Sequence, residues 1–422
     1  MRLFESGAIA VLAVLWSAAL AVSPVAAQAD EDASSRRGNA AEAARTSTDP
    51  ESLIDNCLDN PTPVCALGAA LSVTAEEQLS IIRVDALLAI AETFAELSQI
   101  ERGIRTAEMA REAAEDIGIS IGIDKKLAEL APIWAKLGED ARALETAQSL
   151  SDRYLAANAL GSIAVAQARL GRVEAAQQTI ERLSVPLLAL RYAVDVTDVI
   201  ARNDAGLAAA SELLEGRLKG VDHGLLRGLG YARLALLHAR SGNLEKARAL
   251  YTQAADIVAY LTIGAQRAQL LASLAQVDLA LGDREKYDSD VSRAATLAGR
   301  VRGDFDQMQA LSEVTAALAA GGETDRAVEL ATSVKTLRGQ TALLKRLAHA
   351  PGTQETVRAL ADHILAGLDA EEARSERDRA RLAVATALSR IGAVDRMPQI
   401  IAGMEQRDTK ARGLAVLARV LE

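Results

Sequence analysis

Apolar residues recur along most of this chain at the spacing of one face of an α-helix. From about residue 75 onward they return at i, i+3, i+4 and i+7 almost throughout, which is the pattern of an amphipathic helix. No clear run of alternating β-branched residues interrupts this pattern. The pattern therefore predicts an all-α chain of short helices and no β-sheet.

Breaks in the apolar pattern recur about 30 to 40 residues apart, the range in which helical hairpins repeat. They fall near Ser98, Gly138, Gly171, Asn203, Gly242, Gly282, Gly322, Gly352 and Gly392. Each hairpin in such an array buries its apolar face against its neighbours, so the units stack. We therefore expect a right-handed α-solenoid of antiparallel helix hairpins over residues 74–422.

The breaks also set the expected helices. The first helix of each pair is predicted near 75–97, 125–137, 152–170, 186–202, 223–241, 263–281, 305–320, 340–350 and 370–391. The second is predicted near 100–117, 139–150, 172–183, 205–219, 243–260, 283–299, 323–336, 353–366 and 394–405. A last helix at 408–421 has no predicted partner, and we expect it to cap the array with a polar outer face. Thr74 followed by Glu77 matches the capping box that starts a helix.

Alanines at fixed distances from the breaks resemble the tetratricopeptide repeat family. Small residues are needed where the two helices of a hairpin cross closely. The matching positions are Ala91, Ala110, Ala131, Ala143, Ala164, Ala176, Ala235, Ala247 and Ala254. The family's characteristic Trp and Pro positions are largely absent. The resemblance implies a superhelical scaffold that binds a protein partner along its concave face, and it implies no catalytic residue.

The first 50 residues read as a targeting segment followed by a leader. Ala8 to Val22 is apolar, and Pro24 to Ala27 supplies small residues of the kind a signal peptidase reads. We therefore predict a signal peptide over 1–27, with export to the periplasm and no stable membrane insertion after cleavage. Residues 28–50 are polar, small and mixed in charge, which predicts a disordered leader.

Two cysteines lie within the next segment, residues 51–73. Cys57 and Cys65 are separated by a stretch with two prolines, and an exported compartment would let them form a disulfide. A ring this small would stabilise the fold by about 2 to 3 kcal/mol. A redox pair or a metal site is the alternative, but no histidine lies nearby.

Charge and motifs exclude several classes of function. The formal net charge is −10, with acids and bases interleaved along the helices, so binding to nucleic acid is not expected. Only four histidines occur, none paired at i, i+3 or i+4, and the chain has no Walker loop or nucleophile elbow. We therefore expect no metal, no cofactor and no enzymatic activity.

Four arginines share one position, fifteen residues before a break, and are the candidate binding residues: Arg83, Arg227, Arg267 and Arg377. Successive guanidinium groups on a concave face suit the carboxylates of a ligand. The alternative is that they pair between repeats or lie over alanine-rich surface. A cluster of acids and arginines at residues 371–381 is expected to be a solvated helix start.

The predicted function is a non-enzymatic scaffold or adaptor of the bacterial cell envelope that holds a protein partner of unknown identity. The alternative is a superhelical protein that acts on peptidoglycan or binds glycan. The helical pattern runs to Glu422 and leaves no obvious separate catalytic domain.

Overall fold

The computed structural model describes residues 50–201, 204–219, 221–350 and 352–421, with one compact unit from Pro50 to Glu422. The predicted signal peptide and nearly all of the predicted leader lie outside these residues. Every regular element in the described chain is a helix, so the predicted all-α solenoid is confirmed.

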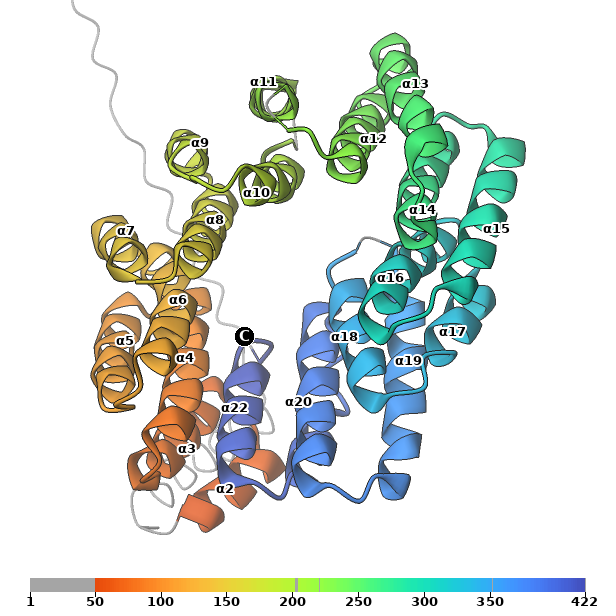
Figure 1. Ribbon diagram of the computed structural model, residues 1–422. Helices are drawn as coiled ribbons and strands as arrows, with labels where there is room; N and C mark the ends of the chain where they lie inside the picture. The colour runs from red at the N-terminus through yellow and green to blue at the C-terminus, as the bar shows by residue number, and fades with distance from the viewer. Residues whose placement is uncertain (1–49, 202–203, 220, 351, 422) are drawn as a thin grey trace, which may run out of the picture. The chain divides into compact units, whose positions relative to one another are not determined.

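The solenoid has an inner and an outer layer of helices (Figure 1). The inner helices are α4 (Ser80–Glu96), α6 (Ser120–Lys136), α8 (Arg153–Arg169), α10 (Pro186–Ile200), α12 (Gly224–Arg240), α14 (Gly264–Ala280), α16 (Asp304–Ala320), α18 (Leu337–Leu347), α20 (Arg374–Arg390) and α22 (Arg407–Ala418). The outer helices are α3 (Pro63–Glu76), α5 (Ile100–Glu115), α7 (Asp140–Ser149), α9 (Val173–Glu181), α11 (Asp204–Leu218), α13 (Leu244–Tyr260), α15 (Arg284–Arg300), α17 (Thr324–Thr332), α19 (Gln354–Gly367) and α21 (Met397–Ala402). A further helix, α2 (Pro50–Asp59), precedes α3, and a 3₁₀ turn (Leu368–Ala370) follows α19.

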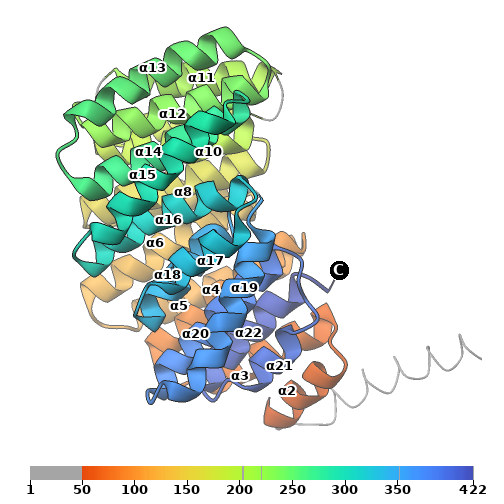
Figure 2. The same cartoon turned by 90° about the vertical axis from the view of Figure 1, so that its right-hand side faces the viewer.

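The inner layer closes into a ring. Each inner helix contacts the next one along the chain, and the last, α22, contacts both α20 and α4. Figure 1 shows the helices arranged around a central space, and Figure 2 shows the same unit turned by 90°. The curvature of successive hairpins therefore brings the two ends of the unit Pro50–Glu422 together.

Helix α22 completes a hairpin with the start of this unit. No outer helix follows α22 in the described chain. Instead α22 packs against α3, which serves as its outer partner. Leu414 and Leu417 are fully buried, and the hydroxyl of Thr93 on α4 lies 3.0 Å from the carbonyl oxygen of Ala415. The expectation that the last helix has no partner is wrong, because its apolar face is covered by α3 and α4.

Several predicted boundaries at the beginning of the array also differ. Instead of one helix at 75–97, α3 ends at Glu76 and α4 begins at Ser80. Thr74 starts no helix; its buried hydroxyl donates to the carbonyl oxygen of Ala70, 2.7 Å away. Helix α6 begins at Ser120, five residues before the predicted start at 125.

The alanines identified from the sequence are the closest points of helix packing. Every one of the nine is fully buried at 0% exposure, from Ala91 on α4 to Ala254 on α13. A methyl group is the largest side chain that such a crossing accepts without displacing the neighbouring helix. The predicted role of these alanines is therefore confirmed.

Apart from the one at Asn203, which lies outside the described residues, the predicted breaks are turns with a left-handed backbone. The described glycines at the breaks have φ between 71° and 86°, and Ser98 takes the same conformation with φ 55°. A side chain is strained there even where space is available.

Gly242→Ala should lower the free energy of unfolding by about 1 kcal/mol, because its φ is 82° while nothing lies within 4 Å of an added Cβ. Gly216→Ala is the matched control. It lies inside α11 with equal space, and removing a helical glycine should stabilise the chain by about 0.5 to 1 kcal/mol. Urea unfolding followed by circular dichroism measures both, and equal shifts of the two variants would contradict the assignment.

Cys57 on α2 and Cys65 on α3 form a disulfide with their Cα atoms 5.5 Å apart. Cys57 is buried, and Thr62 caps α3 by accepting from the backbone amide of Cys65 at 3.2 Å. The pair links α2 to the helix that receives α22.

One acid in the charged segment 371–381 is buried, not solvated. Asp378 on α20 is 0% exposed and accepts hydrogen bonds from the backbone amides of Glu405 and Gln406, at 2.9 and 2.7 Å. Arg381 lies 3.3 Å from the same carboxylate. Asp378 therefore fixes the turn that leads into α22, and the expectation of a wholly solvated face is wrong here.

Candidate functional site: the cavity inside the ring

The inner helices enclose a cavity of about 1540 Å³, which we call the lumen. Every inner helix except α20 contributes lining residues, so the lumen belongs to the whole array. It exceeds the roughly 300 to 1,000 Å³ of common small-molecule pockets. The expected elongated concave surface is thus curled around a half-open cavity.

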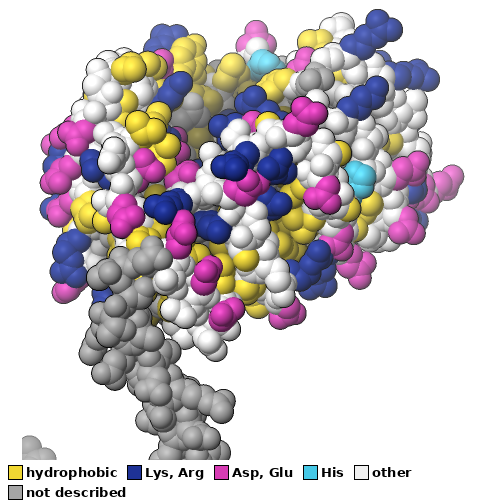
Figure 3. All heavy atoms as spheres, turned by 90° about the horizontal axis from the view of Figure 1, so that it is seen from below, with side chains coloured by type: hydrophobic (Ala, Val, Ile, Leu, Met, Phe, Trp, Pro, Cys, Tyr) yellow, Lys and Arg dark blue, Asp and Glu magenta, His cyan; other side chains and the backbone are white. Residues whose placement is uncertain are grey.

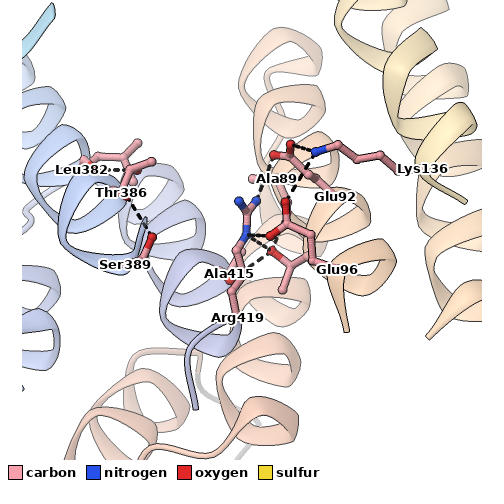
Figure 4. A network of polar contacts seen from close by, with 10 residues as sticks. Ala89, Glu92, Glu96, Lys136, Leu382, Thr386, Ser389, Ala415 and Arg419 are labelled. Carbon is pink, nitrogen blue, oxygen red and sulfur yellow. Dashed lines mark hydrogen bonds and ion pairs between the residues drawn. The ribbon is translucent and has the colours of Figure 1, made fainter. Parts of the chain in front are cut away.

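A polar network crosses the point of ring closure (Figure 4). Arg419, just after α22, donates to Glu92 on α4 at 2.9 Å and lies 3.3 Å from Glu96. Lys136 on α6 pairs with Glu92 from the other side and lies 3.4 Å from Glu96. Two carboxylates are therefore held between two cations from neighbouring helices.

The ion pairs of this network lower the pKa of Glu92. Burial would raise the pKa, but the charges of Lys136 and Arg419 and their hydrogen bonds outweigh it and lower the pKa to about 2. This stabilisation is present above the ordinary pKa of a glutamate and is lost as the pH falls toward 2. Glu92 thus contributes to ring closure across the neutral pH range.

A second charged group lies on α10 and α12. Arg233 pairs with Asp198 through its Nε atom. Asp195 is exposed to the lumen, yet the surrounding ring keeps it from bulk water, and this together with the charge of Asp198 raises its pKa to about 6 despite the opposing charge of Arg191.

A third charged group consists of Arg390, His349 and Arg169, and Arg169 lies on a helix, α8, that is not a neighbour of the other two in the ring. Arg390 on α20 donates to Nδ1 of His349, which directly follows α18, at 3.0 Å. His349 is exposed to the lumen, but the surrounding ring limits its hydration, and this together with the charges of Arg390 and of Arg169 on α8 lowers its pKa to about 4. Because α6, α4 and α22 separate α8 from α20 around the ring, the charge of Arg169 acts on His349 across the lumen.

Apolar side chains line the lumen on α10, α12, α14 and α16. Leu226 and Leu229 are half-buried, and Ile263 and Phe305 are 52% and 68% exposed, all four facing the cavity. The lumen can therefore contact both charged and apolar parts of a ligand. On the outer surface, acidic and basic side chains are interleaved, as Figure 3 shows for one face.

The four arginines predicted to bind a ligand do not line the lumen. Arg83 pairs with Asp116 at 3.3 Å, and Arg377 pairs with Glu405 at 2.6 Å. Arg227 and Arg267 are half-buried, and Nε of Arg267 is buried with no hydrogen-bond partner. Arg83 and Arg377 thus take part in contacts between successive elements, and a ligand-binding role for the four stays a prediction.

Four cations that line or adjoin the lumen share a sequence position that was not predicted to mark a site. A cation stands two residues before the break at Lys136, Arg169, Arg240 and Arg390, in the last turn of an inner helix. The helix dipole favours cations at that end, which makes the signal easy to overlook. Its position relative to the break could have identified it.

Two other kinds of feature are absent from the described part of the chain. The described residues contain no group of His, Cys, Asp and Glu side chains arranged to hold a metal ion. Within the same residues, no helix has both the length and the apolar composition needed to span a bilayer.

Outside the lumen, two acids are buried around one tyrosine. Asp278 and Asp290 lie 3.5 and 3.4 Å from the hydroxyl of Tyr251, and Lys286 lies 3.9 Å from Asp278. Burial raises the pKa of Asp278 to about 7, although Lys286 opposes the shift. The folded chain therefore holds a proton here at a pH where the unfolded chain has released it.

Asp278→Asn should change how stability depends on pH. Because the folded pKa of Asp278 lies above its unfolded value of 3.8, its contribution is present below pH 4 and is lost as the pH rises to about 7. Relative to the wild type, the variant should gain stability over this range at up to about 1.4 kcal/mol per pH unit. Urea unfolding at pH 4 to 8 measures it, with Asp256→Asn on the exposed face of α13 as control. A constant difference between variant and wild type would contradict the raised pKa.

Comparison with known proteins identifies only distant similarity in fold. No family model matches the chain, and no curated protein matches it. Among solved structures, it is similar to a signal transduction ATPase with numerous domains and a tetratricopeptide repeat sensor from Pyrococcus horikoshii, at 17% identity and a TM-score of 0.32 over 79% of this chain and 52% of that one. It is also similar to the apo form of RapI, at 11% identity and 0.32, covering 80% of this chain and 97% of that chain. A circular tandem repeat protein with novel repeat topology gives 14% and 0.26, with 81% and 82% covered. The chain spans about half the length of the first of these.

Proposed function

We propose that this chain is a binding protein that takes a segment of a protein partner into the lumen of the ring. The observation that carries the proposal is the half-open cavity of about 1540 Å³, lined by every inner helix except α20. Its wall offers both exposed apolar side chains, such as Phe305, and charged ones, such as Arg169. A peptide segment presents the same mixture of apolar and polar groups.

We propose binding and not catalysis because of how the polar groups are arranged. The hydroxyl groups in the lumen wall belong to Ser162 and Tyr192, and Tyr192 donates to the side chain of Asn158 at 3.0 Å. A nucleophile needs an adjacent base oriented by a third group. Ser211 and His238 do meet at 3.2 Å outside the lumen, but they are 6% and 5% exposed, and Nδ1 of His238 has no partner to orient it.

We further propose that the protein works in the bacterial cell envelope. The apolar stretch Ala8 to Val22 and the small residues after it support export, and the Cys57–Cys65 disulfide suits an oxidising compartment. Fractionation of cells that express the full chain tests this location directly. Recovery of the chain in the cytoplasm with its first 27 residues intact would contradict it.

Photo-crosslinking from inside the lumen tests the binding function. A photoreactive amino acid at Phe305 on the inner wall should capture a protein partner in cells, whereas the same group at Thr296 on the outer helix α15 should not. Equal capture from both positions, or none from the lumen, would contradict binding inside the ring. Release of muropeptides from peptidoglycan by the purified chain would instead favour the cell-wall alternative.

A further inference from the structure

We propose that Arg169, His349 and Arg390 form a binding site for a multiply charged oxyanion inside the lumen. This deepens the proposed function, on which it rests in taking the lumen as the binding site, because it names the chemistry that the lumen recognises. The three side chains come from different parts of the ring: α8, the end of α18 and the last turn of α20.

Two of the three groups are in contact, and the third, Arg169, lines the same cavity as His349. Arg390 donates to Nδ1 of His349 at 3.0 Å. Arg169 acts on both of them across the lumen, since its charge lowers the pKa of His349 and that of Arg390. Bringing like charges together is unfavourable unless an opposite charge offsets it.

No carboxylate among the described residues offsets the charge of the two guanidinium groups by direct contact. Arg169 and Arg390 are exposed and make no ion pair in the described chain, although both line or adjoin the lumen. The nearest acids are engaged elsewhere: Glu92 and Glu96 pair with Lys136 and Arg419. The charge of Arg169 also acts on Asp195, but the two form no ion pair, and limited hydration inside the ring raises the pKa of Asp195 to about 6. The donors of both arginines therefore remain available to an anion that enters the ring.

Nδ1 of His349 is the acceptor that Arg390 contacts in this structure. An arginine can only donate, so Nδ1 of His349 accepts and the neutral ring carries its proton on Nε2. An oxyanion between Arg169 and Arg390 would draw Arg390 away from Nδ1 and replace the repulsion with attraction. His349 would then gain a proton on Nδ1, so that two guanidinium groups and one imidazolium surround the ligand. Three positive charges favour an anion with two or more negative charges.

Several other charged groups lie around His349 and Arg390 and also influence their protonation. His349 also lies near Arg346, which pairs with Glu313 on α16 at 3.0 Å, and Lys345 lies on the same helix as Arg346. On the facing elements, the groups whose charges reach Arg390 are Glu92, Glu96, Arg419 and Arg169. Neither Glu92 nor Glu96 is hydrogen-bonded to His349 or Arg390, so neither carboxylate occupies the position proposed for the anion.

Calorimetric titration of the full chain with pyrophosphate and with citrate tests the site. Both are multiply charged oxyanions, and comparing them separates phosphate from carboxylate recognition. The double variant Arg169→Gln/Arg390→Gln should bind the preferred anion at least tenfold more weakly. Arg248→Gln on the exposed face of α13 is the matched control and should bind as the wild type does. Titration in two buffers of different ionisation enthalpy should show more proton uptake by the wild type than by His349→Gln.

Each outcome bears on the site. Binding of either anion that is lost in the double variant supports it, and proton uptake that disappears in His349→Gln supports the role of the imidazole. Binding of neither anion, or equal affinity in the double variant and the Arg248→Gln control, overturns the proposal. These titrations contain no protein partner, so failure here leaves the photo-crosslinking result standing. Conversely, anion binding without capture of a partner would reject only the proposed protein-binding function.

Discussion

Ending the chain after residue 406 should open the ring and lower the free energy of unfolding by at least about 3 to 6 kcal/mol. That range is the burial contribution of Leu414 and Leu417 alone, at about 1.5 to 3 kcal/mol for each side chain. The deletion also uncovers the apolar faces of α3 and α4. Urea unfolding measures the loss of stability, and small-angle scattering should show a larger radius of gyration.

A point variant provides the graded control for this deletion. Leu417→Ala should lower the free energy of unfolding by about 2 to 5 kcal/mol while leaving the backbone of α22 in place. Its radius of gyration should stay close to that of the wild type. If the deletion left both the unfolding midpoint and the radius of gyration unchanged, α22 would have no role in closing the ring.

Asp378→Ala should be the most damaging single polar substitution, lowering the free energy of unfolding by about 3 to 5 kcal/mol. The carboxylate is 0% exposed and accepts from the amides of Glu405 and Gln406, which would otherwise be left without these acceptors in the turn before α22. Arg381 would lose its acid in the same step. Relative to the wild type, backbone amide hydrogen exchange in the variant should speed up more at residues 405–418 than in the rest of the chain.

Two controls separate the buried hydrogen bonds from the charge. Asp378→Asn keeps one acceptor oxygen and should lose less stability than the alanine variant. Asp369→Ala removes an exposed acid from the 3₁₀ turn before the same helix and should change stability by less than about 0.5 kcal/mol. Equal losses for Asp378→Ala and Asp369→Ala would mean that the hydrogen bonds at the turn contribute nothing.

The hairpins could be predicted from the sequence because local signals specify them. Apolar spacing gave the inner and outer helices, and the turn glycines and buried alanines lie at the predicted positions. These features depend on contacts within one hairpin or between neighbours. The helices α2 and α3 were less visible because the prolines between Cys57 and Cys65 resemble a loop more than a helix start.

Closure of the ring could not be predicted in this way. It depends on the small rotation between successive hairpins, summed over the whole array, and no single repeat records that sum. The contact between Thr93 and Ala415 joins residues 322 positions apart. Without closure there is no lumen, so the shared position of Arg169 and Arg390 before a break does not reveal that both lie in or beside one cavity with His349. The burial of Asp378 was hidden for the opposite reason, because its charged neighbours suggested an exposed helix.

Zero-length crosslinking tests closure most directly. In the variant Arg419→Lys, the new amine should lie beside Glu92, which Arg419 approaches to 2.9 Å, and a carbodiimide should join residue 419 to Glu92 or Glu96 within one chain. Lys136, which already pairs with Glu92, is the internal positive control in the same sample. The account predicts both crosslinks in the monomeric fraction by mass spectrometry. A Lys136 crosslink without any crosslink at residue 419 would contradict a closed ring.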